Sequence, residues 1–226
     1  MLLQDPIKRL YGKEAFPEIK ISNCALLCID LQYSDAARGF GLFTEESIVE
    51  NPSTFGYYFD RLENIVVPNI RKLQDQARAL EMEVIHVRIM SLTRDGRDRS
   101  LEHKRIGVHV IPGSKESDFL PQVSPQGDEI VLSKTSSGVF NSTAIEYVLR
   151  NLDITQLIIT GVVTNECVET AVRDAGDRGF EVLVPEDGVA ALSEDIHQAS
   201  LASMHLTYGL VTDTATILTK LQKAEK

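Results

Sequence analysis

Residues 157–190 read LIITGVVTNECVETAVRDAGDRGFEVLVPEDGVA, and this stretch predicts a strand, a turn, a helix and a second strand. The apolar residues at 156–160 and 181–184 form continuous runs, as in parallel strands that are covered on both faces. A turn is expected at Gly161, and Thr164 and Asn165 are residue types that cap the start of a helix. Strand, helix and strand in this order indicate an α/β sheet with crossover connections.

The same alternation extends over the rest of the chain. Apolar runs predict further strands at 25–30, 84–89 and 129–132, and a weaker one at 206–211. Helical patterns occupy residues 57–80, 142–151, 165–178, 194–205 and 214–223, with Pro68 expected to kink the first helix. We therefore expect a single-domain, Rossmann-like, three-layer αβα fold over residues 1–226, with a mostly parallel sheet of about six strands. Residues 1–22 are expected to form an N-terminal extension.

Composition limits the classes of function. The 226 residues are 43% hydrophobic and 25% charged, which is typical of a globular protein that folds without disulfides or metals. Lys and Arg total 23 against 33 Asp and Glu, and this acidic balance argues against nucleic acid or an anionic membrane as a partner. No apolar run approaches a membrane span, and the N-terminus lacks a secretory signal pattern. We expect a cytoplasmic protein.

Two long stretches, residues 32–55 and 91–127, fall outside the alternation of strands and helices. Loops of this length are usually functional or disordered. Each follows the C-terminal end of a predicted strand, which is the side on which open α/β sheets bind ligands.

The three cysteines divide into two kinds. Cys24 and Cys28 lie in one predicted strand about 13 Å apart, beyond the roughly 7 Å that a disulfide allows, so we expect both in the core. Cys167 falls in the first turn of the helix after Gly161, where unpaired N–H groups favour a thiolate, lower its pKa and can stabilise an oxyanion. An inert cysteine packed at a helix start is the alternative.

Two ionisable residues end other predicted strands. Asp30 follows the first strand and Lys134 the third, and in a parallel sheet such ends lie on one side, together with the Cys167 turn. Asp30 capping a loop and Lys134 lying at the rim are the structural alternatives. Together the three residues supply a nucleophile, a base and a positive charge, which suit attack on an amide.

Three segments carry a family resemblance: CIDLQ at 28–32, SKTSSGVFNST at 133–143 and TGVVTNECVETAVRDAGDRGFEV at 160–182. They resemble the isochorismatase-like cysteine hydrolases, which include nicotinamidases, N-carbamoylsarcosine amidases, ureidoacrylate amidohydrolases and biuret-type hydrolases. The resemblance implies that Asp30 is the catalytic acid and base, Lys134 the triad lysine and Cys167 the nucleophile. It also implies a cis peptide bond between Val162 and Val163, with the N–H groups of Val163 and Cys167 as the oxyanion hole.

Departures within this family narrow the expected reaction. Isochorismatases that cleave a vinyl ether lack the cysteine, so Cys167 argues against that chemistry. Nicotinamidases typically carry Asp-x-His-x-x-His for a metal, and HVRIMSLTRDGRDRS at 86–100 has no such pattern. We therefore expect no metal and no other cofactor, and nicotinamide is a poorer candidate. The resemblance implies a cysteine amidohydrolase acting through a thioester on a small linear amide or ureide, such as a biuret-like or N-carbamoyl compound. A ureidoacrylate-type or N-carbamoyl amino acid amidase is the alternative.

Substrate contacts and partners are further expectations. Four residues near the strand ends are candidates to face the substrate, each with a structural alternative: Gln32, Tyr33, Arg88 and Phe140. A basic cluster in the second long loop is either solvated or attracts an anionic substrate: Arg94, Arg97, Arg99, Lys104 and Arg105. The only partners expected are the small substrate and further copies of the chain, as a dimer or tetramer.

Other classes of function have weaker support. Gly39-Phe40-Gly41 lacks the third glycine of a dinucleotide-binding loop and does not open a clear helix. No Walker A segment, zinc ligand set or Gly-x-Ser-x-Gly appears. A redox sensor that oxidises Cys167 is the alternative from another class. Asp30 and Lys134 argue against it, because sensing needs no acid or base.

Overall fold

One sheet of seven strands organises the computed structural model, which describes residues 8, 10, 11 and 17–224. Most of the N-terminal extension expected over residues 1–22 thus lies outside the described residues. The pairings between strands are all parallel, in the order β3-β2-β1-β4-β5-β7, with β6 beside β4. The predicted fold class is confirmed, with seven strands in place of about six. The strands are β1 (Cys24–Ile29), β2 (Glu83–Ile89), β3 (Ile130–Lys134), β4 (Gln156–Val162), β5 (Glu181–Pro185), β6 (Val189–Ala190) and β7 (Leu210–Thr212).

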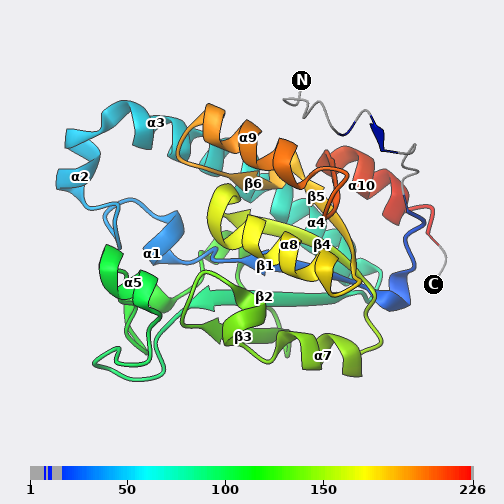
Figure 1. Cartoon of the computed structure of the whole chain (residues 1–226), viewed down its shortest axis with the longest axis horizontal. Coiled ribbons are helices and arrows are strands. Elements are labelled where there is room, and N and C mark those ends of the chain that lie inside the picture. The colour runs from blue at the N-terminus through cyan, green and yellow to red at the C-terminus, as the bar shows by residue number, and fades with distance from the viewer. Residues whose placement is uncertain (1–7, 9, 12–16, 225–226) are drawn as a thin grey trace.

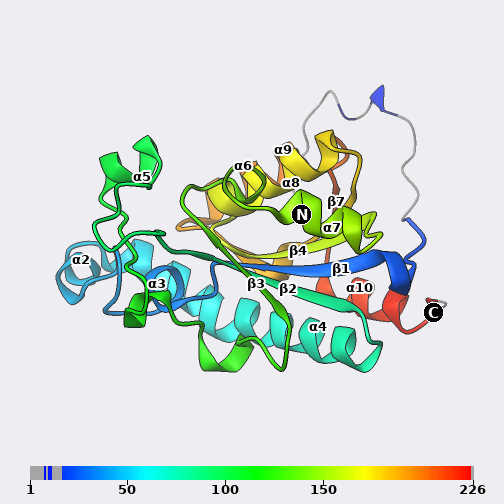
Figure 2. The same ribbon diagram turned by 90° about the horizontal axis from the view of Figure 1, so that it is seen from below.

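Helices cover both faces of the sheet (Figure 2). On one face lie α3 (Pro52–Arg61), α4 (Val67–Ala79) and α10 (Thr214–Leu221), and on the other lie α6 (Val139–Ser142), α7 (Ile145–Asn151), α8 (Glu169–Asp177) and α9 (Glu194–Met204). Three shorter helices gather beyond the carboxyl ends of the strands (Figure 1): α1 (Tyr33–Ala36), α2 (Glu45–Glu50) and α5 (Leu101–Ile106). Two π-helical turns, η3 (Leu62–Val66) and η6 (Thr164–Val168), precede α4 and α8. The 3-10 turns are η2 (Ile21–Asn23), η4 (Lys115–Ser117), η5 (Pro121–Val123) and η7 (Glu186–Gly188).

Each face of the sheet has its own apolar core. Successive residues of a strand point to opposite faces, so Leu26 and Cys28 of β1 join the core under α4, whereas Leu27 and Ile29 join the core under α8. Cys24 and Cys28 are buried and free of disulfides, as expected for core residues. Both faces being covered explains why the strands are continuous apolar runs.

The boundaries of several elements differ from the prediction. The helix expected at 57–80 begins at Pro52 and is interrupted by the η3 turn, which ends just before Pro68, a residue that has no N–H to donate and lies in the first turn of α4. The weak strand expected at 206–211 is shifted to β7, because Leu206 has a φ of 63° and lies in a turn. In the described part of the chain, no helix has the length and apolar character needed to cross a membrane.

Candidate active site

Three strand ends bring Asp30, Lys134 and Cys167 together. Asp30 follows β1, Lys134 is the last residue of β3, and Cys167 lies in the η6 turn after β4. The Nζ atom of Lys134 lies 2.9 Å from Oδ2 of Asp30 and 3.2 Å from Sγ of Cys167. The order of the strands reverses between β1 and β4, and such a switch point is where open α/β sheets bind their ligands.

The backbone at Asp30 leaves the regular strand conformation. Its φ is 54°, in the left-handed region, where aspartate is tolerated better than most residues. Its N–H donates to the carbonyl of Val87 at 2.9 Å, which keeps the turn attached to β2. Its Oδ2 atom lies 2.9 Å from the ammonium of Lys134, and the thiol of Cys167 is its other polar neighbour, so the carboxylate is placed to accept a proton from the sulfur.

Lys134 is completely buried, which is rare for lysine and requires a partner for its charge. Besides Asp30 and Cys167, its ammonium donates to the carbonyl of Ser136 at 3.1 Å. Burial lowers the pKa of Lys134, but the charges of Asp30 and Cys167 and the hydrogen bonds to both together outweigh it, so the pKa is above its ordinary value. Lys134 is therefore a permanent positive charge beside the sulfur.

Cys167 differs from the expectation in one respect. The start of the helix was expected to lower the pKa of the thiol, and that prediction is wrong: burial raises the pKa well above its ordinary value. Lys134 opposes this rise, and the charge of Asp30 adds to it. Cys167 is thus a neutral thiol at rest and requires a base before it can act as a nucleophile.

The η6 turn is held by a buried polar chain instead of a side-chain cap. Val163 occupies the capping position, so neither Thr164 nor Asn165 caps the helix as expected. The hydroxyl of Thr164 lies 3.0 Å from Nδ1 of His197, and Nε2 of His197 lies 2.8 Å from the guanidinium of Arg61. Because Arg61 can only donate, Nε2 accepts and Nδ1–H donates to Thr164. Burial, followed by the charge of Arg61, lowers the pKa of His197 to about 4, so this histidine is neutral near pH 7.

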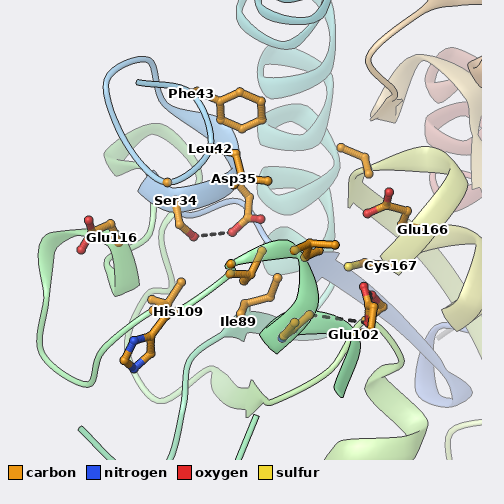
Figure 3. A pocket seen from close by; sticks show the side chains of 18 of the residues that line it. Ser34, Asp35, Leu42, Phe43, Ile89, Glu102, His109, Glu116, Glu166 and Cys167 are labelled. Carbon is orange, nitrogen blue, oxygen red and sulfur yellow. Dashed lines mark hydrogen bonds and ion pairs between the residues drawn. The ribbon is translucent and has the colours of Figure 1, made fainter. Parts of the chain in front are cut away.

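A cavity of about 480 Å³ opens at these strand ends (Figure 3). The two long loops noted in the sequence supply much of its wall, including Phe43 from the first and His103 from the second. Val163 and Cys167 also line it. Asp30 and Lys134 are at most 1% exposed, whereas Cys167 is 6% exposed, so a bound molecule meets the sulfur before it meets the ion pair.

Carboxylates that the sequence did not single out surround Cys167. Asp35, Glu102 and Glu166 line the cavity and are arranged around the sulfur in Figure 3. Burial and then the charge of Asp30 raise the pKa of Asp35 to about 7, and burial and then the charge of Glu102 raise the pKa of Glu166. A sequence signal was present, since Asp35 follows the end of a strand and Glu166 precedes Cys167, but nothing in the sequence showed that their side chains share a cavity.

The structure does not place Gln32 or Arg88 on the cavity wall formed by the described residues. The amide of Gln32 is buried, donates to the carbonyls of Ile89 and Glu116 and accepts from the N–H of Ile89 at 2.6 Å. The guanidinium of Arg88 donates to Ser133 and to the carbonyl of Ser117. Both side chains therefore connect strand ends and loops, and neither is free to bind a substrate.

Tyr33 and Phe140 are also directed elsewhere. The ring of Tyr33 packs edge-on against Phe40 and beneath the ammonium of Lys115. Phe140 is buried in the core under α8, where its ring lies 6.1 Å from that of Phe180. Apolar packing explains both positions, and neither residue is among the described residues of the cavity wall.

The basic cluster of the second loop is largely occupied by local contacts. Arg97 pairs with Asp95, the guanidinium of Arg99 donates to the carbonyls of Gly96 and Val108, and Lys104 donates to the carbonyl of Arg97. Within the described wall of the cavity there is no residue of this cluster. The arrangement favours the interpretation of the cluster as part of a loop surface.

Two further expectations concern the backbone and metals. The peptide bond between Val162 and Val163 is cis in the structure. Across the described ranges, no group of three or more His, Cys, Asp and Glu side chains is placed to hold a metal ion. A reaction without a metal stays a prediction.

Comparisons with known proteins agree with this fold. Among curated proteins, the chain is similar to Nicotinamidase 3 of Arabidopsis thaliana, with 23% identity over 163 residues, 69% of this chain and 79% of that protein. It is also similar to an N-carbamoylsarcosine amidase of an Arthrobacter species, with 25% identity over 158 residues, 68% of this chain and 60% of that protein.

Among solved structures, a cysteine hydrolase of Pseudomonas syringae pv. phaseolicola 1448A has the same fold. Its TM-score is 0.81 at 24% identity, and the match covers 95% of this chain and 99% of that one. A model of the isochorismatase domain matches residues 24–216. This match runs from the first residue of β1 into α10 and takes in Asp30, Lys134 and Cys167, so the chain belongs to the isochorismatase family of hydrolases.

Proposed function

We propose that this protein is a metal-independent cysteine amidohydrolase that cleaves the C–N bond of a small linear amide or ureide through a thioester. The observation that carries the proposal is the position of the Lys134 ammonium, 2.9 Å from Asp30 and 3.2 Å from the sulfur of Cys167, at the edge of a cavity. This arrangement joins a base, a cation and a nucleophile within hydrogen-bond distance.

The first half of the reaction begins with the neutral thiol. Asp30 accepts the proton of Cys167, and the positive charge of Lys134 stabilises the thiolate that forms. The thiolate adds to the carbonyl carbon of the substrate, and the carbonyl oxygen becomes an oxyanion. The N–H groups of Val163 and Cys167 are the proposed donors to that oxyanion, since both residues line the cavity. Asp30 then returns its proton to the nitrogen, the C–N bond breaks, and ammonia or an amine leaves.

The second half consumes water. Asp30 accepts a proton from a water molecule, which attacks the carbonyl carbon of the thioester. A second oxyanion forms at the same donors and collapses, the C–S bond breaks, and the proton on Asp30 passes to the sulfur. The carboxylic or carbamic acid departs, and Asp30, Lys134 and Cys167 return to their starting protonation states.

The proposed substrates are biuret-like or N-carbamoyl compounds. Two similar proteins are named N-carbamoylsarcosine amidase and nicotinamidase, and both names denote amidases. The cavity of about 480 Å³ suits a small molecule. A cytoplasmic location and a dimer or tetramer stay predictions.

Ammonia release across a panel of ureides, N-carbamoyl amino acids and simple amides tests the proposal. For any substrate that turns over, acid-quenched protein is expected to carry an acyl adduct on Cys167 by mass spectrometry. Cys167→Ala should abolish both the adduct and ammonia release. Cys28→Ala removes a buried thiol from β1 and serves as the matched control, which should stay active. Ammonia release by Cys167→Ala at the wild-type rate would overturn the mechanism.

A further inference from the structure

We infer that, among linear amides and ureides, the cavity selects those whose chain carries an ammonium or similar nitrogen cation, with Asp35 and Glu166 as the residues that bind the charge. This inference rests on the proposed amide hydrolysis and names its substrate class. Its basis is the charge of the cavity wall beside Cys167.

The described wall of the cavity is negatively charged. It contains four carboxylates, Asp35, Glu102, Glu116 and Glu166, and no Lys or Arg among the described residues. Lys134 is the cation beside the sulfur, and its charge is paired with Asp30. Such a wall repels an anion and attracts a cation, because charges in a cavity are screened less than charges on an open surface.

Two of these carboxylates, Asp35 and Glu166, lie near Cys167 in Figure 3 and have no ion-pair partner among the described residues. Glu102 accepts from the hydroxyl of Ser137, at 2.8 and 3.0 Å, and lies 4.0 Å from Nε2 of His103. Glu116 lies on the opposite side of the view from Cys167 in Figure 3. Asp35 is half-buried and is hydrogen-bonded through one oxygen to the hydroxyl of Ser34, whereas Glu166, which precedes Cys167, is exposed at the mouth of the cavity.

The free protein holds these carboxylates at an electrostatic cost. Burial and the charge of Asp30 disfavour the ionised form of Asp35, and burial and the charge of Glu102 disfavour that of Glu166. A substrate ammonium between Asp35 and Glu166 would offset the negative charges around each of them. No Lys or Arg in the described wall competes with it for the two carboxylates. A bound cation therefore favours the ionised form of both side chains, which the free cavity disfavours.

The rest of the wall suits a short alkyl chain. Apolar side chains of the two long loops and of α3 line the cavity: Leu42, Phe43, Phe55, Ile106, Val108 and Val110. A substrate of this class would match the wall in three places. Its amide carbonyl would lie at Cys167, its methylene groups against these apolar side chains, and its terminal ammonium at Asp35 and Glu166.

Three amides of matched length test the inference. They are 4-aminobutanamide, which is cationic, pentanamide, which is neutral, and the monoamide of glutaric acid, which is anionic. We expect kcat/KM for the cation to exceed that for the neutral amide by roughly tenfold, the effect of one partly screened charge pair, and the anion to be poorest. Equal values, or a preference for the anion, would overturn the inference.

Variants identify the residues responsible. Asp35→Asn and Glu166→Gln keep the shape of each side chain and should each lower the ratio of kcat/KM between 4-aminobutanamide and pentanamide. Asp177→Asn removes the same charge at the exposed far end of α8 and should leave the ratio unchanged. A ratio that is unaffected by both cavity variants would overturn the assignment of Asp35 and Glu166.

A labelling experiment separates this inference from the proposed hydrolysis. Cationic (trimethylammonio)ethyl and anionic sulfonatoethyl methanethiosulfonate both modify thiols, and each rate on Cys167 is divided by that reagent's rate on free 2-mercaptoethanol. Cys167→Ala shows which labelling belongs to this residue. A faster normalised rate for the cation, with no amide hydrolysed, would contradict the proposed function and support a cation-selective cavity. An equal or faster rate for the anion would overturn the inference, even if amides are hydrolysed.

Discussion

Ile29 and Gly161 face each other in the parallel pairing of β1 and β4, and a Cβ atom on residue 161 would lie 2.0 Å from the carbonyl oxygen of Ile29. Gly161 also has a φ of 118°, which side chains disfavour. The close approach brings the residue after Ile29, which is Asp30, beside the strand that leads to Cys167. Glycine at this position therefore sets the separation of the two strand ends that form the site.

Gly161→Ala should destabilise the protein by about 3 kcal/mol or more, because the methyl group meets backbone that cannot move without breaking the sheet. The free energy of unfolding in urea measures this change. Gly39→Ala is the control, since Gly39 has a φ of 83° but no atom within 4 Å of its Cβ position. It should cost only about 1 kcal/mol. Similar losses in the two variants would show that conformation, and not the approach of Ile29, is the cause.

Lys134→Met should abolish amide hydrolysis and destabilise the protein by about 3–5 kcal/mol, because it leaves the Asp30 carboxylate buried without its counter-ion. Combining it with Asp30→Asn removes both charges. We expect this double variant to recover most of the stability and none of the activity. Urea unfolding and ammonia release measure the two effects, and a double variant as unstable as Lys134→Met would contradict the role of charge pairing.

Asp35→Asn should stabilise the protein, and more so at high pH. The folded state raises the pKa of Asp35 from 3.8 to about 7, so the wild type loses stability as pH rises from about 4 to 7. Since Asp35 is half-buried, we expect a gain of about 2 kcal/mol for the variant at pH 8, which shrinks toward pH 4. Urea unfolding at both pH values measures it. A gain independent of pH would contradict the role of ionisation.

His197→Gln should remove a loss of stability in acid. The folded state lowers the pKa of His197 from 6.5 to about 4, so the unfolded state binds a proton first as pH falls. The wild type therefore loses up to about 3 kcal/mol between pH 6.5 and 4 through this group. Glutamine can still donate to Thr164 and accept from Arg61. The difference in unfolding free energy between variant and wild type should move in favour of the variant as pH falls, and a constant difference would contradict it.

Much of the fold follows from the sequence because the sheet is covered on both faces. Continuous apolar runs identified β1, β2, β4 and β5 within one or two residues of their bounds. The short helices α1, α2 and α5 were not predicted: α2 and α5 begin at local caps, Thr44 and Ser100, but six residues are too few for a helical pattern, and a contact distant in the chain fixes the start of α1. The N–H of Tyr33 in α1 donates to the carbonyl of Asp118. β6 is two residues long and too short to show a pattern.

The candidate site was predictable where it depends on strand ends and unpredictable where it depends on side-chain direction. Parallel strands place Asp30, Lys134 and Cys167 on one side whatever the loops do. Gln32 was expected to face a substrate, but its amide is hydrogen-bonded to the N–H and the carbonyl of Ile89. This contact depends on the register of β1 beside β2, which the sequence does not reveal. The direction of Asp35 into the cavity likewise depends on α1, which the sequence did not reveal.

An ammonium group has three N–H bonds, and each of those on Lys134 has an acceptor before any substrate arrives: Asp30, Cys167 and the carbonyl of Ser136. All three hydrogen-bond donors of the Lys134 ammonium are therefore used. A substrate oxygen would have to displace one of these acceptors to reach it, and two of them hold the reacting proton and sulfur in place. Lys134 thus holds its three neighbours in place, and an inhibitor designed to accept a hydrogen bond from its ammonium would find no free donor.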